Sequence, residues 1–553
     1  MMRFGLLCYF FVAVTCNPEV TTSRGTIVGV YTRILDVDME SFLSIPYVEP
    51  PVGLLRYEKP QEYGLFPELK LNGTAYPPAC PQIVGSLAQA SNISQSEDCL
   101  YLNIFRRRGT NLNDQKAVLV IFHGGLFLQP GGFSHGTSAD PHQNPEALVA
   151  AGDVILVTFN YRLGVLGFAD LKEFAPANLG LHDQRAALAW VKENIGEFGG
   201  NANDVTVMGT GAGSMSIVAH IMSFVDNRDF FHTAILDGGV LSSNALLEDT
   251  TSSFRRISKI AYDLGCPLNS RDMIECLQDS DLEDLISLSE EYMPANGLAA
   301  FVPTADGFII PTRPDAFIDD NNVLLKKVRL MIGFAEDEGT LFTNYTKSTF
   351  NFTEDKTEDE ITNYCLKLSD AYNYPLDVRD RLTKDTVKEI YAARHEKWPR
   401  RAVVTFQGDG VVKCPTNNFI KQLCRRTSEV FVYHFERKFS KNYLPEMEDL
   451  GVFHTSPFQH FVGSLFLYVK PGDMAPEDRR FMLDTMKMIT DFVADQESNP
   501  RFRDLEWPSF AETGKVLVIR DEPRLRGGLL RRSICDEVFT PPYKTGKVWM
   551  KIN

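Results

Sequence analysis

The sequence has no excess of positive charge and, beyond its first residues, no long apolar run. Its 553 residues include 56 Lys and Arg against 72 Asp and Glu, which gives a formal net charge of −16. A surface of that sign repels nucleic acid and anionic membranes, so we expect no nucleic-acid partner. No stretch after residue 16 is apolar for the ~20 residues that a membrane helix requires, so we expect no transmembrane segment.

The first sixteen residues have the pattern of a secretory signal peptide. Arg3 supplies the positive charge, residues 4–14 form an apolar run too short to cross a bilayer, and small residues near Cys16 provide a cleavage site. No linker, internal repeat or low-complexity tract divides the rest of the chain. We therefore predict a signal peptide at residues 1–16 and one secreted domain at residues 17–553, with no lipid-anchor signal at the C-terminus.

Eight cysteines follow this leader, and an oxidising compartment would join them as disulfides. Spacing alone does not give their pairing. Four Asn-X-Ser/Thr tripeptides are predicted glycosylation sites in the same compartment, at Asn72, Asn92, Asn344 and Asn351.

Continuous apolar runs alternate along the chain with segments of helical periodicity. This alternation predicts an α/β fold with a large, mostly parallel central sheet and helices on both of its faces. One predicted helix covers residues 183–191 and opens on Asp183, since helix N-termini favour acidic residues. The charged stretch 354–360 is predicted to be a solvated loop. The runs that predict buried strands are residues 117–122, 154–159, 205–208, 234–236, 330–332 and 430–433.

The most informative segment is residues 205–216, where a β-branched strand leads through small residues into an apolar helix. This is the setting of the nucleophile elbow, G-x-S-x-G, in which a sharp strand-to-helix turn projects one side chain above a sheet. The central residue here is Gly211, between Gly209 and Gly213. Gly211 has no side chain to project, so the position of the nucleophile is empty.

Together with this elbow, four further blocks identify the chain as similar to the carboxylesterase/cholinesterase family of α/β-hydrolases. The resemblance spans roughly residues 25–535 and implies the α/β-hydrolase fold. It also implies a catalytic triad of serine, glutamate and histidine in that chain order. The four blocks are residues 45–53 (Ile-Pro-Tyr-Val-Glu-Pro-Pro-Val-Gly), 96–103 (Ser-Glu-Asp-Cys-Leu-Tyr-Leu-Asn), 160–164 (Asn-Tyr-Arg-Leu-Gly) and 198–200 (Phe-Gly-Gly).

By this resemblance, Glu338 is the acid and His454 is the base of the triad. In such a relay the carboxylate orients the imidazole, which takes the proton of the attacking hydroxyl. The family's oxyanion-hole donors correspond to the backbone amides of Gly124, Gly125 and Ala212. Without a hydroxyl at Gly211, His454 has nothing to deprotonate, and loss of the nucleophile in a hydrolase of another fold lowers turnover about a million-fold.

Two further departures from the family accompany Gly211. Leu126 replaces the last glycine of the donor loop, and its restricted backbone would misplace an oxyanion donor. Pro457 stands where the family usually has an acidic residue. Three departures together indicate natural loss of catalysis and not a single introduced change. Glu338 and His454 would then persist structurally, because deleting one partner leaves the other buried without a hydrogen bond.

No nearby hydroxyl is expected to replace the missing serine. Ser214 and Ser216 fall in the helix after the elbow and are expected to be packed there, while Thr210 precedes the tip and should point elsewhere.

The resemblance also implies three disulfides, Cys80–Cys99, Cys266–Cys276 and Cys414–Cys535. Cys365 and Cys424 are left over, and they could pair together, stay free or link two chains. In cholinesterases the loop that matches residues 81–98 carries a tryptophan that holds the choline cation. This loop has no Trp, Tyr or Phe, which removes the main reason to expect acetylcholine as a ligand.

These observations favour a secreted, non-catalytic protein that acts by binding, as the cholinesterase-like adhesion proteins do. Its expected partner is an extracellular protein or a small apolar ligand held in the former substrate pocket, and no cofactor or metal is predicted. The alternative is an active carboxylic ester hydrolase with a non-standard nucleophile or an altered elbow in this sequence. Ligand storage is a third hypothesis, and the sequence gives no oligomeric state.

Overall fold

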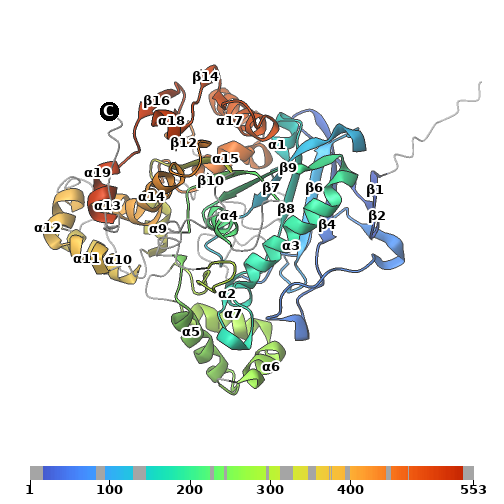
Figure 1. Cartoon of the computed structure of the whole chain (residues 1–553), viewed down its shortest axis with the longest axis horizontal. Helices are drawn as coiled ribbons and strands as arrows, with labels where there is room; N and C mark the ends of the chain where they lie inside the picture. The colour runs from blue at the N-terminus through green and yellow to red at the C-terminus, as the bar shows by residue number, and fades with distance from the viewer. Residues whose placement is uncertain are drawn as a thin grey trace, which may run out of the picture.

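A computed structural model of the chain places an 11-stranded sheet at its centre (Figure 1). Each apolar run predicted to be a strand corresponds to a strand of this sheet. The strand predicted at residues 154–159 begins one residue later, at Ile155. The structure describes residues 17–82, 94–128, 145–223, 230–241, 246–268, 270–293, 298–311, 328–346, 357–372, 374, 376–392, 399–441, 443, 450–470 and 472–539.

Parallel pairing dominates the middle of the sheet and antiparallel pairing its ends. The strand order is β16-β15-β12-β11-β10-β9-β7-β8-β6-β4-β3. The seven strands from β15 to β8 in this order pair in parallel, while β16, β6, β4 and β3 join in antiparallel fashion. The strands are β3 (Val30–Ile34), β4 (Val37–Pro46), β6 (Tyr101–Arg107), β7 (Lys116–Phe122), β8 (Ile155–Phe159), β9 (Gly200–Thr210), β10 (Thr233–Asp237), β11 (Arg329–Ala335), β12 (Val430–Phe435), β15 (Lys515–Ile519) and β16 (Arg524–Gly527).

Both faces of the sheet are buried, which explains why its strands read as continuous apolar runs. In β7, Val118 and Val120 belong to one hydrophobic cluster, and the alternate residues Leu119 and Ile121 belong to another. The first cluster also contains buried residues of two helices, α3 (Leu179–Asn194) and α4 (Ala212–Met222). The second includes α1 (Glu146–Ala151), α15 (Ser456–Val462) and α17 (Pro476–Ala494). The predicted α/β class with helices on both faces is confirmed.

The structure corrects two local predictions. Helix α3 begins at Leu179, so Asp183 lies in its second turn and does not open it. The Asp183 side chain is fully buried and forms an ion pair with Arg162, with a shortest N–O distance of 2.7 Å. The predicted loop 354–360 is also partly wrong, because Thr357 caps α10 (Glu358–Ala371) and its charged residues form the first turn. Residues 354–356 lie outside the described residues.

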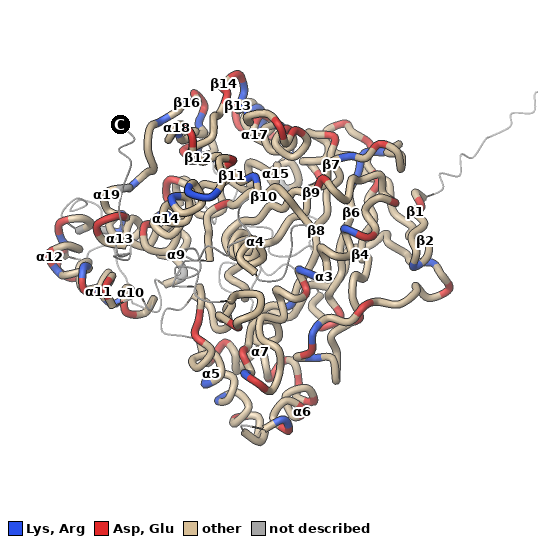
Figure 2. Tube along the Cα trace, viewed as in Figure 1, with Lys and Arg blue, Asp and Glu red and all other residues tan. Residues whose placement is uncertain are grey.

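Two groups of the remaining helices stand apart at the edges of the molecule in Figure 1. Helices α5 to α7 form the lower lobe, while α10 to α13 form the left edge. Figure 2 shows acidic and basic residues all round the outside of the molecule, whereas α4 contains neither Lys, Arg, Asp nor Glu. The remaining helices are α2 (Gly164–Phe168), α5 (Thr250–Asp263), α6 (Arg271–Asp279), α7 (Leu282–Glu291), α9 (Gly339–Thr346), α11 (Leu376–Arg381), α12 (Lys384–Val387), α13 (Pro399–Gly408), α14 (Cys414–Leu423), α16 (Leu465–Tyr468), α18 (Phe510–Thr513) and α19 (Arg532–Ile534).

The structure contains the three disulfides that the family resemblance implies. They join Cys80 to Cys99, Cys266 to Cys276 and Cys414 to Cys535. The last pair is 121 residues apart in the sequence and ties the C-terminal region to α14. Two further cysteines of the described residues are free: Cys365 is buried in α10, and Cys424 is partly buried at the end of α14. Burial raises the pKa of the Cys424 thiol to about 12, so this thiol stays protonated at neutral pH.

Candidate functional site

The turn from β9 into α4 is built from three glycines, and close packing requires the outer two. A Cβ on Gly209 would lie 2.4 Å from the carbonyl carbon of Gly213, and a Cβ on Gly213 would lie 2.1 Å from the Phe122 oxygen. Only glycine lets strand and helix approach so closely. Gly211 sits at the tip with φ 52° and ψ −116°, a backbone conformation that side-chain-bearing residues rarely adopt.

The Gly211 tip faces the ring of His454. A Cβ built on Gly211 would lie 2.9 Å from Nε2 of His454, which is the direction in which an elbow side chain projects. On the other side of the ring, Nδ1 lies 2.6 Å from Oε2 of Glu338. Among the described residues, Glu338 is the hydrogen-bond partner found for this imidazole. The structure therefore brings together all three positions that the sequence assigned to the triad.

Glu338 and His454 meet because their neighbours pair across two loops. Asp337 follows β11, and its backbone N–H donates to the Val452 carbonyl at 2.8 Å. Its carboxylate accepts the Val452 N–H at 2.9 Å, and Asp337 also forms a bridge with Phe453. Glu338 is itself fixed, since Oε1 accepts the Ala335 N–H at 2.7 Å. Sequence reasoning did not single out Asp337, although it sits directly before the predicted acid.

A second buried carboxylate, Asp237, lies beneath this pair. It ends β10, is fully buried, and accepts hydrogen bonds from Tyr433 at 2.6 Å and Thr210 at 2.9 Å. Burial and the nearby charge of Glu338 raise the pKa of Asp237 to about 7. Sequence reasoning missed Asp237. An acidic residue at the carboxyl end of a buried strand was the available signal, because ligands of α/β sheets bind at these strand ends.

The imidazole of His454 is only 6% exposed, and its charge state depends on the carboxylates around it. Burial by itself would lower its pKa, but the charge and hydrogen bond of Glu338, with a smaller effect of Asp237, raise it above the ordinary value. The ring also contacts Phe342, with 5.0 Å between ring centres. Glu338 therefore makes the imidazole easier to protonate than that of a free histidine.

The donor loop after β7 adopts an unusual backbone. Gly125 has φ 111°, and the two residues that follow, Leu126 and Phe127, have φ 57° and 63°. Left-handed backbone costs a non-glycine residue ~1–2 kcal/mol, so packing holds Leu126 in a conformation suited to the glycine it replaces. The Leu126 side chain is buried. His123, which opens this loop, stacks on Tyr161 with 4.2 Å between ring centres.

A narrow cavity lies over Gly211. Its polar boundary includes Gly125, Ala212 and His454, so two of the three predicted oxyanion donors border it. The centres of water-sized groups can occupy about 30 Å³ of this space. The rest of the boundary is largely apolar and includes Leu126, Met215, Leu246, Leu341, Phe342 and Val411.

Three hydroxyl groups close to the elbow in the sequence are used in the packing of the fold, whereas Thr455, which borders the cavity, has a buried hydroxyl with no hydrogen-bond partner among the described residues. The Thr210 hydroxyl donates to Asp237, and Ser214 donates to the Gly239 carbonyl at 2.5 Å. Ser216 donates to the Ala212 carbonyl at 2.9 Å and accepts from Gln184. Both serines are fully buried. Pro457, the third departure from the family, lies in the first turn of α15.

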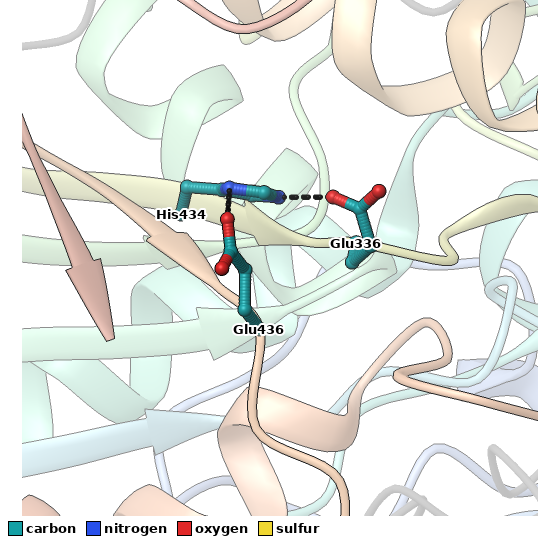
Figure 3. A group of neighbouring side chains, drawn as sticks. All are labelled: Glu336, His434 and Glu436. Carbon is teal, nitrogen blue, oxygen red and sulfur yellow. Dashed lines mark ion pairs between the residues drawn. The ribbon is translucent and has the colours of Figure 1, made fainter. Parts of the chain in front are cut away.

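One further group, away from the elbow, brings possible metal ligands together. Glu336, His434 and Glu436 at the ends of β11 and β12 have donor atoms within 4.8 Å of one another (Figure 3). Nε2 of His434 lies 2.8 Å from Glu336 and Nδ1 lies 3.2 Å from Glu436. Arg401 and Arg520 also reach these carboxylates, at 3.9 and 3.2 Å. Because the acids already have cationic partners, we interpret the group as an ion-pair network.

Other predicted features are partly covered by the structure. Asn72 is exposed, and Asn344 lies in α9, where its side chain accepts a hydrogen bond from Arg400. Asn92, Asn351, most of the loop 81–98 and the predicted leader 1–16 lie outside the described residues. Within the described part of the chain, every helix is too short or too polar to cross a membrane.

The fold and the elbow together define an α/β-hydrolase, and comparison with known proteins identifies the family. The profile of the Carboxylesterase family matches residues 16–535, so the chain belongs to this family. It is 32% identical to a cholinesterase of Mus musculus over 535 residues, 93% of this chain and 85% of the relative. It is 28% identical to an acetylcholinesterase of Bungarus fasciatus over 542 residues, 94% of this chain and 85% of the relative.

Proposed function

We propose that this chain is a non-catalytic member of the carboxylesterase family that acts by binding. The observation that carries the proposal is the residue at the elbow tip. Nε2 of His454 faces Gly211, which has no hydroxyl, at the place where the family's nucleophile projects. Glu338 and His454 would form the acid and base of a relay that has no proton to move.

Two features of the site support the loss of the nucleophile. The hydroxyls of Thr210, Ser214 and Ser216 are buried and donate to groups other than the His454 ring. The donor loop carries Leu126 in a left-handed conformation at the position of a family glycine. With neither a nucleophile nor the family's donor loop, we expect ester turnover at or near the level of the uncatalysed reaction.

We also propose that the protein is secreted and meets its partner outside the cell. Support comes from the predicted leader and from three disulfides, since disulfides form and persist in oxidising compartments. The partner would be an extracellular protein or a small ligand of the cavity over Gly211. The negative net charge of −16 favours a partner with a basic surface through long-range attraction.

The experiment is an esterase assay on the purified, disulfide-intact protein. 4-Nitrophenyl butyrate reports turnover, and a fluorophosphonate probe reports an activated serine by covalent labelling. An active cholinesterase serves as the positive control, and the His454→Ala variant identifies turnover that depends on the site. We expect no labelling and no difference between the wild type and this variant. Labelling, or turnover that His454→Ala abolishes, would refute the proposal.

The competing function is an active ester hydrolase with a non-standard nucleophile, and the retained Glu338–His454 pair favours it. The Gly211→Ser variant separates the two by supplying the missing hydroxyl. If the rest of the machinery is intact, the variant gains labelling and turnover. If Leu126 has displaced the oxyanion donors, turnover stays about 10²–10³-fold below that of a complete site, which is the usual effect of losing one donor.

A further inference from the structure

We propose that an open groove between helix α5 and the end of helix α7 binds a sulfated tyrosine of an extracellular partner protein. Both helices lie in the lower lobe of Figure 1. The groove shares no lining residue with the cavity over Gly211, and it offers about 440 Å³ to water-sized groups, within the ~300–1,000 Å³ of ligand sites. The inference rests on the proposed secretion, since tyrosine sulfation occurs on exported proteins, but it does not depend on the loss of catalysis.

Two basic side chains form one wall of the groove. Arg255 and Lys259 are exposed and stand four residues apart in α5, so they lie on the same face of the helix. Among the described residues neither side chain has an ion-pair partner, whereas the adjacent Arg256 pairs with Glu248 at 2.6 Å. Like charges at this spacing repel each other. An anion that contacts both side chains relieves this repulsion, so the groove favours an oxyanion as its ligand.

Aromatic and apolar side chains form the rest of the groove. Tyr262, in the last turn of α5, is 71% exposed, and Leu268, just beyond the helix, is 41% exposed. Tyr292 caps the end of α7, and Nζ of Lys259 lies 5.5 Å from the centre of its ring. Exposed apolar side chains that gather in one groove are typical of a binding site. The two tyrosine rings offer stacking surfaces to an aromatic group.

Two links hold the walls of the groove in place before a ligand binds. The Cys266–Cys276 disulfide ties the segment that carries Leu268 to α6. The Tyr292 hydroxyl donates a hydrogen bond to Asp263, the last residue of α5, and this bond joins the ends of the two helices. A groove that is already ordered loses little conformational freedom on binding.

The spacing and the charge of the groove select an aryl sulfate. Lys259 and Tyr262 are three residues apart, which is ~4.5 Å along the helix axis. The sulfur of a tyrosine sulfate lies at a similar distance from the centre of its own ring, so one such side chain reaches a cation and a tyrosine ring together. Asp263 is the one acid among the described lining residues, so the groove has a net charge of +1.

A sulfate ester carries a single negative charge, which matches that of the groove. A phosphate ester carries ~−1.5 to −2 at pH 7 and would be repelled more strongly by Asp263. A sulfated sugar chain carries many charges, and the protein, with its net charge of −16, repels such a polyanion beyond the groove. A sulfated tyrosine is therefore favoured over both.

The test titrates the purified protein with three pentapeptides by saturation-transfer difference NMR at 150 mM salt. The peptides have the sequence Gly-Gly-Tyr-Gly-Gly with both ends blocked, and their tyrosine is unmodified, sulfated or phosphorylated. We expect the sulfated peptide to bind at least about tenfold more tightly than the unmodified peptide, and more tightly than the phosphorylated one. Equal binding of the sulfated and unmodified peptides, binding of neither, or tighter binding of the phosphorylated peptide would overturn the proposal.

Three variants localise the ligand. Arg255→Gln and Lys259→Gln each remove one charge from an exposed side chain, so we expect both to fold and each to weaken the sulfated peptide at least about fivefold. The matched control Arg271→Gln removes a charge from an exposed arginine of α6 that does not line the groove, and it should leave the Kd unchanged. Equal weakening by the control, or unweakened binding in both groove variants, would refute the placement of the ligand.

A heparin tetrasaccharide tests the other source of sulfate. We expect it to bind more weakly than the sulfated peptide, and tighter binding that Arg255→Gln weakens would replace the sulfated tyrosine by a sulfated sugar and overturn the proposal.

Failure of this inference is distinguishable from failure of the proposed function. Ester turnover that His454→Ala abolishes contradicts the non-catalytic function and leaves the groove unaffected. Retention of the protein inside expressing cells contradicts the proposed secretion without changing a Kd measured on the purified chain. Absence of peptide binding overturns only the groove.

Discussion

The Gly211→Ser substitution tests how far the site has adapted to the loss of its side chain. Gly211 has φ 52° and ψ −116°, and a non-glycine residue held in such a sparsely populated region costs ~1–3 kcal/mol. The new Cβ would also lie 2.9 Å from Nε2 of His454, closer than ordinary van der Waals contact allows. Both effects destabilise the folded state relative to the unfolded chain.

The ring of His454 has little freedom to move away from that Cβ. Glu338 holds Nδ1 at 2.6 Å, and Phe342 packs against the ring with 5.0 Å between centres. On a further side, Gly238 approaches so closely that a Cβ there would lie 3.0 Å from the ring. Inserting atoms into such packing costs ~1–3 kcal/mol, so we expect Gly211→Ser to lower the free energy of unfolding by about 2–6 kcal/mol in total.

Urea denaturation with intact disulfides measures this change, and Gly53→Ser is the matched control. Gly53 has nearly the same φ, 55°, and no described atom lies within 4 Å of a Cβ built on it. The control therefore reports the cost of a side chain at a positive φ without steric contact, and Gly211→Ser should lose at least about 1 kcal/mol more. Equal losses in the two variants would show that the His454 ring relaxes freely, and the steric reasoning would then be wrong.

Two further predictions concern pH and disulfides. Asp237 has a folded-state pKa near 7, above its unfolded value, so its protonated form stabilises the fold below pH 4 and this contribution is lost as the pH rises through 7. In the Asp237→Asn variant, the free energy of unfolding should therefore fall less between pH 4 and pH 7 than in the wild type. Urea titrations of both proteins measure this fall, and an equal fall in the two would contradict the pKa assigned to Asp237. In the chain-entropy model, opening the Cys414–Cys535 loop of 121 residues costs about 2 kcal/mol more than opening the Cys266–Cys276 loop of 10. Paired Cys→Ser variants measured in urea check this difference, and equal losses would contradict it.

The sequence by itself determined the fold class and the place of the elbow. Strands buried on both faces are continuous apolar runs, and Gly209 is required by its contact with Gly213, four residues later in the chain. Requirements of this kind produce patterns in the neighbouring sequence, so strand β9 and the elbow tip at Gly211 could be predicted from the sequence. The family blocks located Glu338 and His454 only through resemblance.

Two predictions from local patterns were wrong for different reasons, one because of a distant partner and one because a nearby helix cap was overlooked. Asp183 resembled a helix-opening acid, but Arg162, 21 residues earlier, holds it inside the second turn of α3. The charged stretch near residue 358 resembled a loop, yet the capping residue Thr357 begins a helix there. Asp237 was missed because its importance depends on Tyr433 and Glu338, which lie far away in the sequence.

Only the tertiary structure decided what the site contains. His454 and Glu338 are 116 residues apart, and the pairing of their loops through Asp337 sets their 2.6 Å contact. The same packing aims Nε2 at Gly211 and leaves a small apolar cavity bounded by Ala212. Distances between remote side chains depend on how strands and loops stack in space, and no spacing along the chain records that arrangement.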